Sequence, residues 1–241
     1  MTTTPEVDIV VPVRVGATNQ QLRYALRSWA ANIPHRHVWI VGHLPTWARD
    51  VRHIPTRQNG TKYQNTTAAV RAACLNQDVS ETFLLCNDDF FVMKPQEAGV
   101  PVLHRGPVSR VEAYYTSRAQ RPGRYLRGLR ATRDLLVSLG HENPLSYELH
   151  VPLPVEKTGM LTALDVCRRL DVVHKRTAYG VLNNIGGEEI RDVKVLNRSP
   201  KFDRTSPFLS TMPDSFAHGQ VGQFIRHAFP RACRYESGDR S

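Results

Sequence analysis

The feature that most constrains the fold of this chain is an apolar run near its start, VDIVVPVRV at residues 7–15. The run is rich in β-branched residues and almost free of polar ones, as is typical of a strand buried on both faces of a parallel sheet. After it, the segment 19–33 carries apolar residues from Leu22 to Trp29 at helical spacing, and Asn19 stands where an N-cap is expected. The first 33 residues therefore predict a strand, a turn and a helix.

Along the rest of the chain, apolar runs typical of strands continue to alternate with segments that have the apolar spacing of helices. Further strands are predicted at 37–42, 82–86 and 192–196, and further helices at 61–77, 124–139, 155–170 and 214–228. Strands that alternate with helices favour a mainly parallel sheet. We therefore expect an α/β fold in which residues 1–241 form a single Rossmann-like domain, with a mixed, mainly parallel sheet flanked by helices.

The composition is that of an ordinary globular protein, with 41% hydrophobic and 22% charged residues in 241 positions. No stretch approaches the roughly 20 apolar residues that cross a bilayer, and the first residues lack the pattern of a secretory signal. The four cysteines show no CxxC spacing. These features predict a cytoplasmic protein with no transmembrane segment, zinc site or disulfide framework.

The chain is basic, with 32 Lys and Arg against 22 Asp and Glu, and such a field attracts phosphates, nucleic acid or anionic surfaces. Arginines recur every third residue, at 118, 121, 124, 127, 130 and 133. On a helix they would form a slowly winding stripe that could grip DNA phosphates. The alternative is an exposed helix whose arginines face water.

The most informative polar segment is the turn Asn87-Asp88-Asp89, which follows the apolar strand 82–86 and precedes Phe90 and Phe91. In a parallel sheet this turn and Arg14 would lie at the carboxyl ends of strands, where ligands bind. Two adjacent carboxylates suit Mg²⁺ or Mn²⁺ bridging the phosphates of a nucleotide diphosphate. A simple strand-ending turn is the alternative, but the apolar flanks would make two unpaired charges costly.

Other residues suggest parts of the same chemistry. Arg57 and Lys62 flank the segment NGTKYQN and could hold a diphosphate, or could belong to a solvated loop. His150 is a candidate general base, and Glu148 lies two residues earlier, where it could orient the imidazole or act as the base itself. Arg176 could stabilise a leaving phosphate, or could only begin a charged helix.

Several blocks, in order, resemble a known group of enzymes: VDIVVPVRVGATN, LRYALRSW, VWIVG, NDDFFVMKP and HVPLPVEK. Together they are similar to Stealth-type sugar-phosphate transferases and related small glycosyltransferases, including bacteriophage ones. The resemblance implies a GT-A-like fold that binds a nucleotide-diphosphate sugar. Residues 7–105 would form the nucleotide-sugar and metal-binding half, and residues 106–241 the acceptor-binding half.

The resemblance also implies roles for single residues. It places Asp8, Pro12, Val13 and Arg14 near the nucleotide, and Asp88 and Asp89 near the metal and the diphosphate. It matches His150 to the family's histidine block, Arg176 to its phosphate-binding arginine and, loosely, Asp214 to its last block.

The chain departs from the Stealth pattern in two ways. It is short, and no Trp-Val-Asp follows the first strand. These departures favour ordinary glycosyl transfer over sugar-1-phosphate transfer. We therefore predict a glycosyltransferase that uses Mn²⁺ or Mg²⁺ and a nucleotide-diphosphate sugar, acting on a protein, a modified DNA base or a glycan, in the host cytoplasm if phage-encoded. The alternatives are a Stealth-like sugar-1-phosphate transferase and a basic nucleic-acid-binding protein without catalysis.

Overall fold

The fold is built on a five-stranded sheet with the strand order β3-β2-β1-β4-β7. The structure is a computed structural model that describes residues 7–16, 18–118, 121–198 and 201–237. The strands are β1 (Asp8–Val13), β2 (Val38–Gly42), β3 (Arg52–Ile54), β4 (Thr82–Leu85) and β7 (Leu153–Glu156). All neighbouring strands run parallel except β7, which pairs antiparallel with β4. The predicted α/β fold with a mixed, mainly parallel sheet is confirmed, and it is consistent with a Rossmann-like arrangement in one compact domain.

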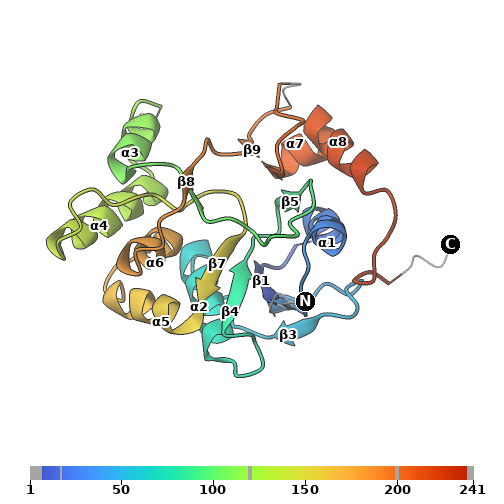
Figure 1. Cartoon of the computed structure of the whole chain (residues 1–241), viewed down its shortest axis with the longest axis horizontal. Coiled ribbons are helices and arrows are strands. Elements are labelled where there is room, and N and C mark those ends of the chain that lie inside the picture. Colours follow the sequence, from blue (N-terminus) through green and yellow to red (C-terminus); the bar gives the residue numbers. More distant parts are fainter. Residues whose placement is uncertain (1–6, 17, 119–120, 199–200, 238–241) are drawn as a thin grey trace.

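Helices cover both faces of this sheet (Figure 1). On one face lies α1 (Gln20–Asn32), and on the other lie α2 (Lys62–Leu75), α5 (Lys157–Val166) and α6 (Lys175–Leu182). The alternation of β1 explains the two layers, because Ile9 and Val11 pack with α1 while Val10 packs with α2. Each of these three side chains is fully buried. The near-continuous apolar run at the start of the chain thus packs into two hydrophobic cores, one on each face of the sheet.

The remaining elements form smaller units around this centre. A three-stranded sheet joins β5 (Phe90–Val92), β10 (Phe208–Thr211) and β9 (Lys194–Val195), in that order, and a two-stranded sheet pairs β6 (Leu103–His104) with β8 (Glu188–Glu189). The other helices are α3 (Val108–Thr116), α4 (Arg124–Ser138), α7 (Pro213–His218) and α8 (Gln220–Ala228). Because β5 begins directly after Asp89, the acidic turn connects the central sheet to the three-stranded sheet.

Two predicted helices have wrong boundaries. The helix expected at 155–170 runs only from Lys157 to Val166, because residues 153–156 form the edge strand β7. The helix expected at 214–228 is two helices, α7 and α8, separated by Gly219 in an extended conformation (φ −95°, ψ 161°). The sequence analysis also missed β3, β5, β7, β10, α3 and the β6–β8 pair, and it considered α6 only as an alternative for Arg176. Apart from α3 and α6, these are strands of two to four residues, too short to show a period.

Asn19 occupies the N-cap position of α1 but does not cap the helix with its side chain. Its backbone is left-handed, with φ 47°, and its side-chain amide donates instead to the carbonyl oxygen of Arg14 at 3.3 Å. The residue therefore ties the start of α1 to the end of β1.

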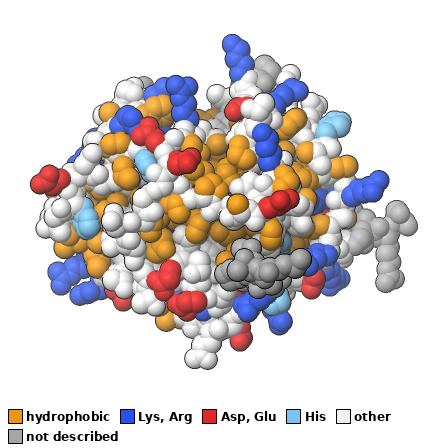
Figure 2. Space-filling view, viewed as in Figure 1, with side chains coloured by type: hydrophobic (Ala, Val, Ile, Leu, Met, Phe, Trp, Pro, Cys, Tyr) orange, Lys and Arg blue, Asp and Glu red, His pale blue; other side chains and the backbone are white. Residues whose placement is uncertain are grey.

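The arginine repeat does not form one basic stripe. Arg118 follows α3, residues 119–120 lie outside the described residues, and α4 begins only at Arg124. Arg130 and Arg133 of α4 both pair with Glu112 of α3. On the face shown in Figure 2, Lys and Arg side chains are spread around the surface and mixed with acidic ones. Of the six arginines, four lie on α4 and two of these are neutralised by Glu112, which does not favour the interpretation as a phosphate-binding stripe.

No helix in the described part of the chain is both long and apolar enough to cross a membrane. All four cysteines are free. Burial raises the pKa of the Cys86 thiol to about 12, so this side chain behaves as a small apolar group in the core.

Candidate active site at the carboxyl edge of the sheet

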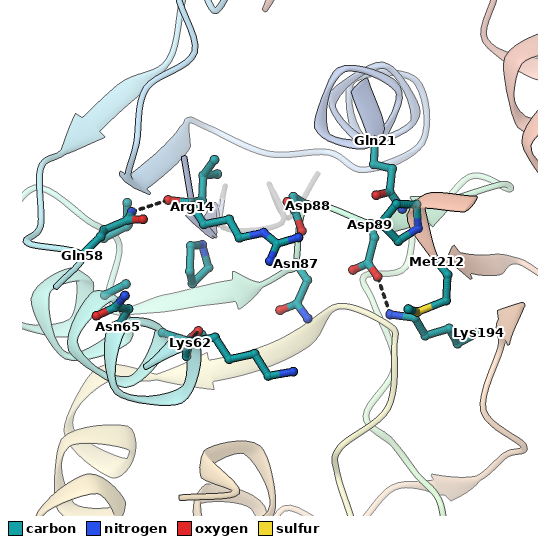
Figure 3. A pocket seen from close by; sticks show the side chains of 16 residues that line it. Arg14, Gln21, Gln58, Lys62, Asn65, Asn87, Asp88, Asp89, Lys194 and Met212 are labelled. Atoms are coloured by element: carbon teal, nitrogen blue, oxygen red, sulfur yellow. Dashed lines mark hydrogen bonds and ion pairs between the residues drawn. The ribbon is translucent and has the colours of Figure 1, made fainter. Parts of the chain in front are cut away.

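A cavity of about 470 Å³ lies beyond the carboxyl ends of β1 and β4 (Figure 3). Ligands of open α/β sheets bind at this edge, where the connecting loops converge. The cavity is lined by Pro12, Val13, Arg14, Gln21, Val41, Gln58, Lys62, Asn65, Thr66, Ala69, Asn87, Asp88, Asp89, Lys194, Met212 and Pro213. These include both predicted metal ligands and five of the predicted donor-binding residues: Pro12, Val13, Arg14, Lys62 and Asn87.

The wall next to Arg14 is held by Gln58, which the sequence analysis did not identify. Its side-chain amide donates to the carbonyl oxygen of Val13 at 2.7 Å and accepts from the amide of Val15 at 3.4 Å. Gly42 makes this contact possible: its φ is +111°, and a Cβ there would lie 2.3 Å from the Gln58 amide nitrogen. Only glycine fits this close approach without strain, so Gly42 and Gln58 together set the path of the loop that carries Arg14.

Asp88 projects toward the cavity with its charge unbalanced by any hydrogen-bonding side chain of the described residues. Burial and the neighbouring charge of Asp89 raise the pKa of Asp88 to about 6, although the positive charges of Arg14 and Lys194 act in the opposite direction. Figure 3 shows the Arg14 guanidinium directed toward this carboxylate. The ionised carboxylate is thus costly at neutral pH, and an added cation would relieve that cost.

Asp89 differs from its neighbour because its charge is balanced. One carboxylate oxygen accepts hydrogen bonds from the Lys194 ammonium at 2.7 Å and from the Ser210 hydroxyl at 3.2 Å. Lys194 belongs to β9 and Ser210 to β10, so both partners come from the small sheet that begins after the acidic turn. The other oxygen of Asp89 makes no hydrogen bond within the described residues, which leaves it available to a ligand.

Positive side chains surround the two carboxylates. Arg14 approaches from the end of β1, Lys194 from β9, and Lys62 from the first turn of α2, reaching across the cavity (Figure 3). That turn is held by a capping box in which Thr61 and Gln64 bond each other's backbone. Three cations against two carboxylates make a cavity suited to a ligand with several negative charges.

The residues present fit a divalent cation that arrives with an anionic ligand. Within the described ranges, no group of three or more His, Cys, Asp or Glu side chains is placed to hold a metal ion. Mg²⁺ and similar ions often take only one or two protein carboxylates and complete their shell with phosphate oxygens and water. Asp88 and the free oxygen of Asp89 could supply such a pair.

Asp8 is not part of this cavity, which overturns its predicted place near the nucleotide. It is the first residue of β1, at the opposite end of the strand from Arg14, and it is fully buried. Its two oxygens accept from Arg36 at 3.0 and 2.8 Å and from the Trp39 indole at 2.9 Å. Burial would raise the pKa of Asp8, but these hydrogen bonds and the Arg36 charge lower it overall. Asp8 therefore anchors the amino edge of the sheet.

Glu148 also has a different place from the one predicted. Its carboxylate accepts the backbone N–H groups of Arg176 at 3.1 Å and of Thr177 at 3.3 Å, at the start of α6. A carboxylate in this position stabilises a helix N-terminus. Its contacts are with α6 rather than with the ring of His150.

Arg176 lies behind the acidic turn and does not line the cavity. Only 5% of it is exposed, and its guanidinium donates to the carbonyl oxygens of Leu85 and Val151, each at 2.7 Å. It also lies 5.0 Å from the centre of the Phe90 ring. These contacts join the end of β4 to the segment that carries His150, so Arg176 positions the site but is not placed to contact a phosphate.

His150 lies next to the acidic turn, with its ring edge-on to Phe90 at a centroid distance of 5.9 Å. Its Nδ1 is 2.9 Å from both oxygens of Asp192. Because an ionised carboxylate only accepts, Nδ1 must carry the proton of this bond. The side chain of His150 is 25% exposed and lies next to the acidic turn, outside the lining of the cavity. The sequence analysis missed Asp192, although it stands in the predicted strand 192–196.

Two further predicted residues lie outside the cavity. Arg57 is exposed and does not line it, whereas the neighbouring Gln58 does. Asp214 lies in the first turn of α7 beside the lining residues Met212 and Pro213, but its carboxylate pairs with Arg198 at 2.6 Å. Asp214 is thus neutralised at the rim.

Comparison of the chain with models of known protein families gives no match, and a search of curated proteins gives none either. The similarity of its sequence blocks to Stealth-type enzymes therefore stays a prediction. Functional inference rests on the geometry of the cavity.

Proposed function

We propose that this protein is a metal-dependent glycosyltransferase that moves a sugar from a nucleotide-diphosphate sugar to a hydroxyl acceptor. The observation that carries the proposal is the combination, in one cavity at the carboxyl edge of the sheet, of the unbalanced carboxylate of Asp88, the free oxygen of Asp89 and three cations. A diphosphate with its divalent cation complements both sets of charges.

In this proposal the protein's own residues bind and orient the donor. Arg14, Lys62 and Lys194 face the diphosphate, while Pro12 and Val13 form the wall near the nucleoside. Mn²⁺ or Mg²⁺, when bound by the two aspartates, supplies positive charge to the departing phosphate. The three basic side chains add to that electrostatic stabilisation.

The transfer step uses His150 as the base. The acceptor hydroxyl gives its proton to Nε2 of His150, and its oxygen forms a bond to the anomeric carbon of the donor sugar. The bond from that carbon to the phosphate oxygen breaks, and its electron pair leaves with the nucleoside diphosphate. A general base at this position contributes about 10² to 10⁴ in rate in typical enzymes.

The balanced charge of a second, neighbouring cavity favours a glycan or protein hydroxyl over a DNA base as the acceptor. This second cavity, of about 860 Å³, shares Lys194 with the donor cavity. Its charged lining residues are balanced in sign: Glu188, Asp192 and Asp203 against Arg191, Lys194 and Lys201. A surface that grips a nucleic-acid backbone needs a clear excess of positive charge.

The two alternatives to glycosyl transfer lead to different products or none. A sugar-1-phosphate transferase would release a nucleoside monophosphate, whereas the proposed reaction releases a nucleoside diphosphate. A nucleic-acid-binding protein would need neither donor nor metal. It is less favoured here, because Arg130 and Arg133 are paired with Glu112.

The first test is the thermal stability of the purified protein with a panel of nucleotide-diphosphate sugars, each with and without Mn²⁺. A ligand that binds only the folded state raises the melting temperature. We expect a shift that needs both donor and metal, and its loss in Asp88→Asn. The matched control is Asp214→Asn, since Asp214 lies at the rim and is paired with Arg198. Equal shifts in the wild type and in Asp88→Asn would overturn the proposal.

A further inference from the structure

A short segment before and within β9 connects the two parts of the site. Asp192 stands two residues before Lys194, the first residue of β9. Asp192 bonds the imidazole of His150, and Lys194 bonds the carboxylate of Asp89. The segment therefore holds His150 and the acidic turn side by side.

Asp192 is enclosed by partners that keep it ionised. Its side chain is 16% exposed, and Arg105 lies 3.5 Å from one of its oxygens. Burial would raise the pKa of Asp192, but the hydrogen bonds from His150 and the positive charge of Arg105 lower it overall. The backbone N–H of His150 also donates to this carboxylate, at 3.3 Å. Both the ring and the backbone of His150 are thus fixed by one residue.

We propose that Asp192 is a positioning residue that holds the Nδ1–H tautomer of His150, so that Nε2 is unprotonated and open to the acceptor hydroxyl. A neutral imidazole carries only one ring proton, and a carboxylate at Nδ1 decides which nitrogen holds it. When Nε2 takes the acceptor proton, the carboxylate stabilises the imidazolium that forms. This inference rests on the proposed function for its catalytic consequence, but the tautomer is a property of the free protein.

The tautomer is measured directly by NMR of the full chain labelled with ¹⁵N in its histidines, at a pH where the imidazoles are neutral. His150→Gln assigns the signal. We expect wild-type His150 to show protonated Nδ1 and unprotonated Nε2, and Asp192→Ala to lose this preference. Asp203→Ala is the control, because Asp203 is an exposed carboxylate in the following loop that bonds Thr205 in its own turn rather than His150. Wild-type protein with the proton on Nε2 would overturn the inference even if no variant folds.

The catalytic consequence is tested with Asp192→Asn in the presence of donor, Mn²⁺ and an acceptor. By comparison with the same change in a Ser-His-Asp triad, we expect kcat to fall by up to about 10⁴-fold. The KM for donor and the metal-dependent shift in melting temperature should stay unchanged. An equal loss of donor affinity and kcat would show a structural role only. Absence of donor binding in the wild type would instead refute the proposed function and leave the tautomer result standing.

Discussion

Replacing Asp88 by asparagine is expected to stabilise the metal-free protein at neutral pH. The carboxylate of Asp88 is half-buried next to Asp89, and no side chain of the described residues balances it with a hydrogen bond. Asparagine has nearly the same shape and carries no charge. The variant therefore removes a cost that the wild type bears when no cation is bound.

The size of the effect follows from the pKa of Asp88, which rises from 3.8 to about 6. A difference of about two units corresponds to roughly 3 kcal/mol at most, since each unit is worth about 1.4 kcal/mol. Between these two values the native state binds more protons than the unfolded state, so the stability of the wild type falls as pH rises through this window. Above about pH 6 the ionised Asp88 lowers the stability of the wild type by the full amount, and below pH 3.8 this loss of stability disappears.

The assay is urea or thermal unfolding of both proteins in EDTA, near pH 7.5 and near pH 4. We expect a gain of about 1–3 kcal/mol for Asp88→Asn at the higher pH, or roughly 2–10 °C in melting temperature. The gain should shrink toward zero at the lower pH. Glu97→Gln, at an exposed carboxylate, is the control for a general charge effect. A variant no more stable than the wild type near pH 7.5 would refute this account of Asp88.

Three other substitutions test separate parts of the site. Lys194→Met should weaken binding of a nucleoside diphosphate in calorimetry by about tenfold or more, and should lower unfolding stability by about 1–3 kcal/mol because Asp89 loses its charge partner. Arg176→Met should destabilise the protein by about 2–4 kcal/mol, because the carbonyl groups of Leu85 and Val151 lose their hydrogen-bond donor. At a temperature where the variant is folded, its affinity for a nucleoside diphosphate should be unchanged. A loss of affinity there would show that Arg176 contacts phosphate. Gly42→Ala should lower the free energy of unfolding by about 1–3 kcal/mol and weaken donor binding, because the added methyl group displaces Gln58. If the variant were as stable in denaturant as the wild type, the close contact between Gly42 and Gln58 would be contradicted.

The part of the candidate site that lies at the ends of strands could be predicted from the sequence. The apolar runs before Arg14 and before Asp88 indicated two buried strands, and parallel strands bring their carboxyl ends to one edge. Lys62 followed from the start of the next helix. These residues do meet in one cavity. Asp8 was misplaced because the resemblance assigned it to the nucleotide, whereas strand direction puts it at the opposite edge.

The partners of these residues could not be predicted in the same way. Lys194 pairs with Asp89 across 105 positions of sequence, and β9, which carries it, has only two residues. Glu148 and Arg176 looked like catalytic candidates as residue types, but their contacts are with backbone groups of α6 and β4. A sequence pattern does not show whether a charged side chain meets a ligand or a buried carbonyl.

The sequence by itself determined the central layers of this protein and the edge at which its polar residues gather, because the period of apolar residues dictates which face of a strand or helix is buried. Only the tertiary structure decided how the charges are shared. It left Asp88 unbalanced, paired Asp89 with Lys194 and joined His150 to Asp192. Such pairings depend on short strands and loops brought together by the packing of the whole chain, and that packing leaves no local signal in the sequence.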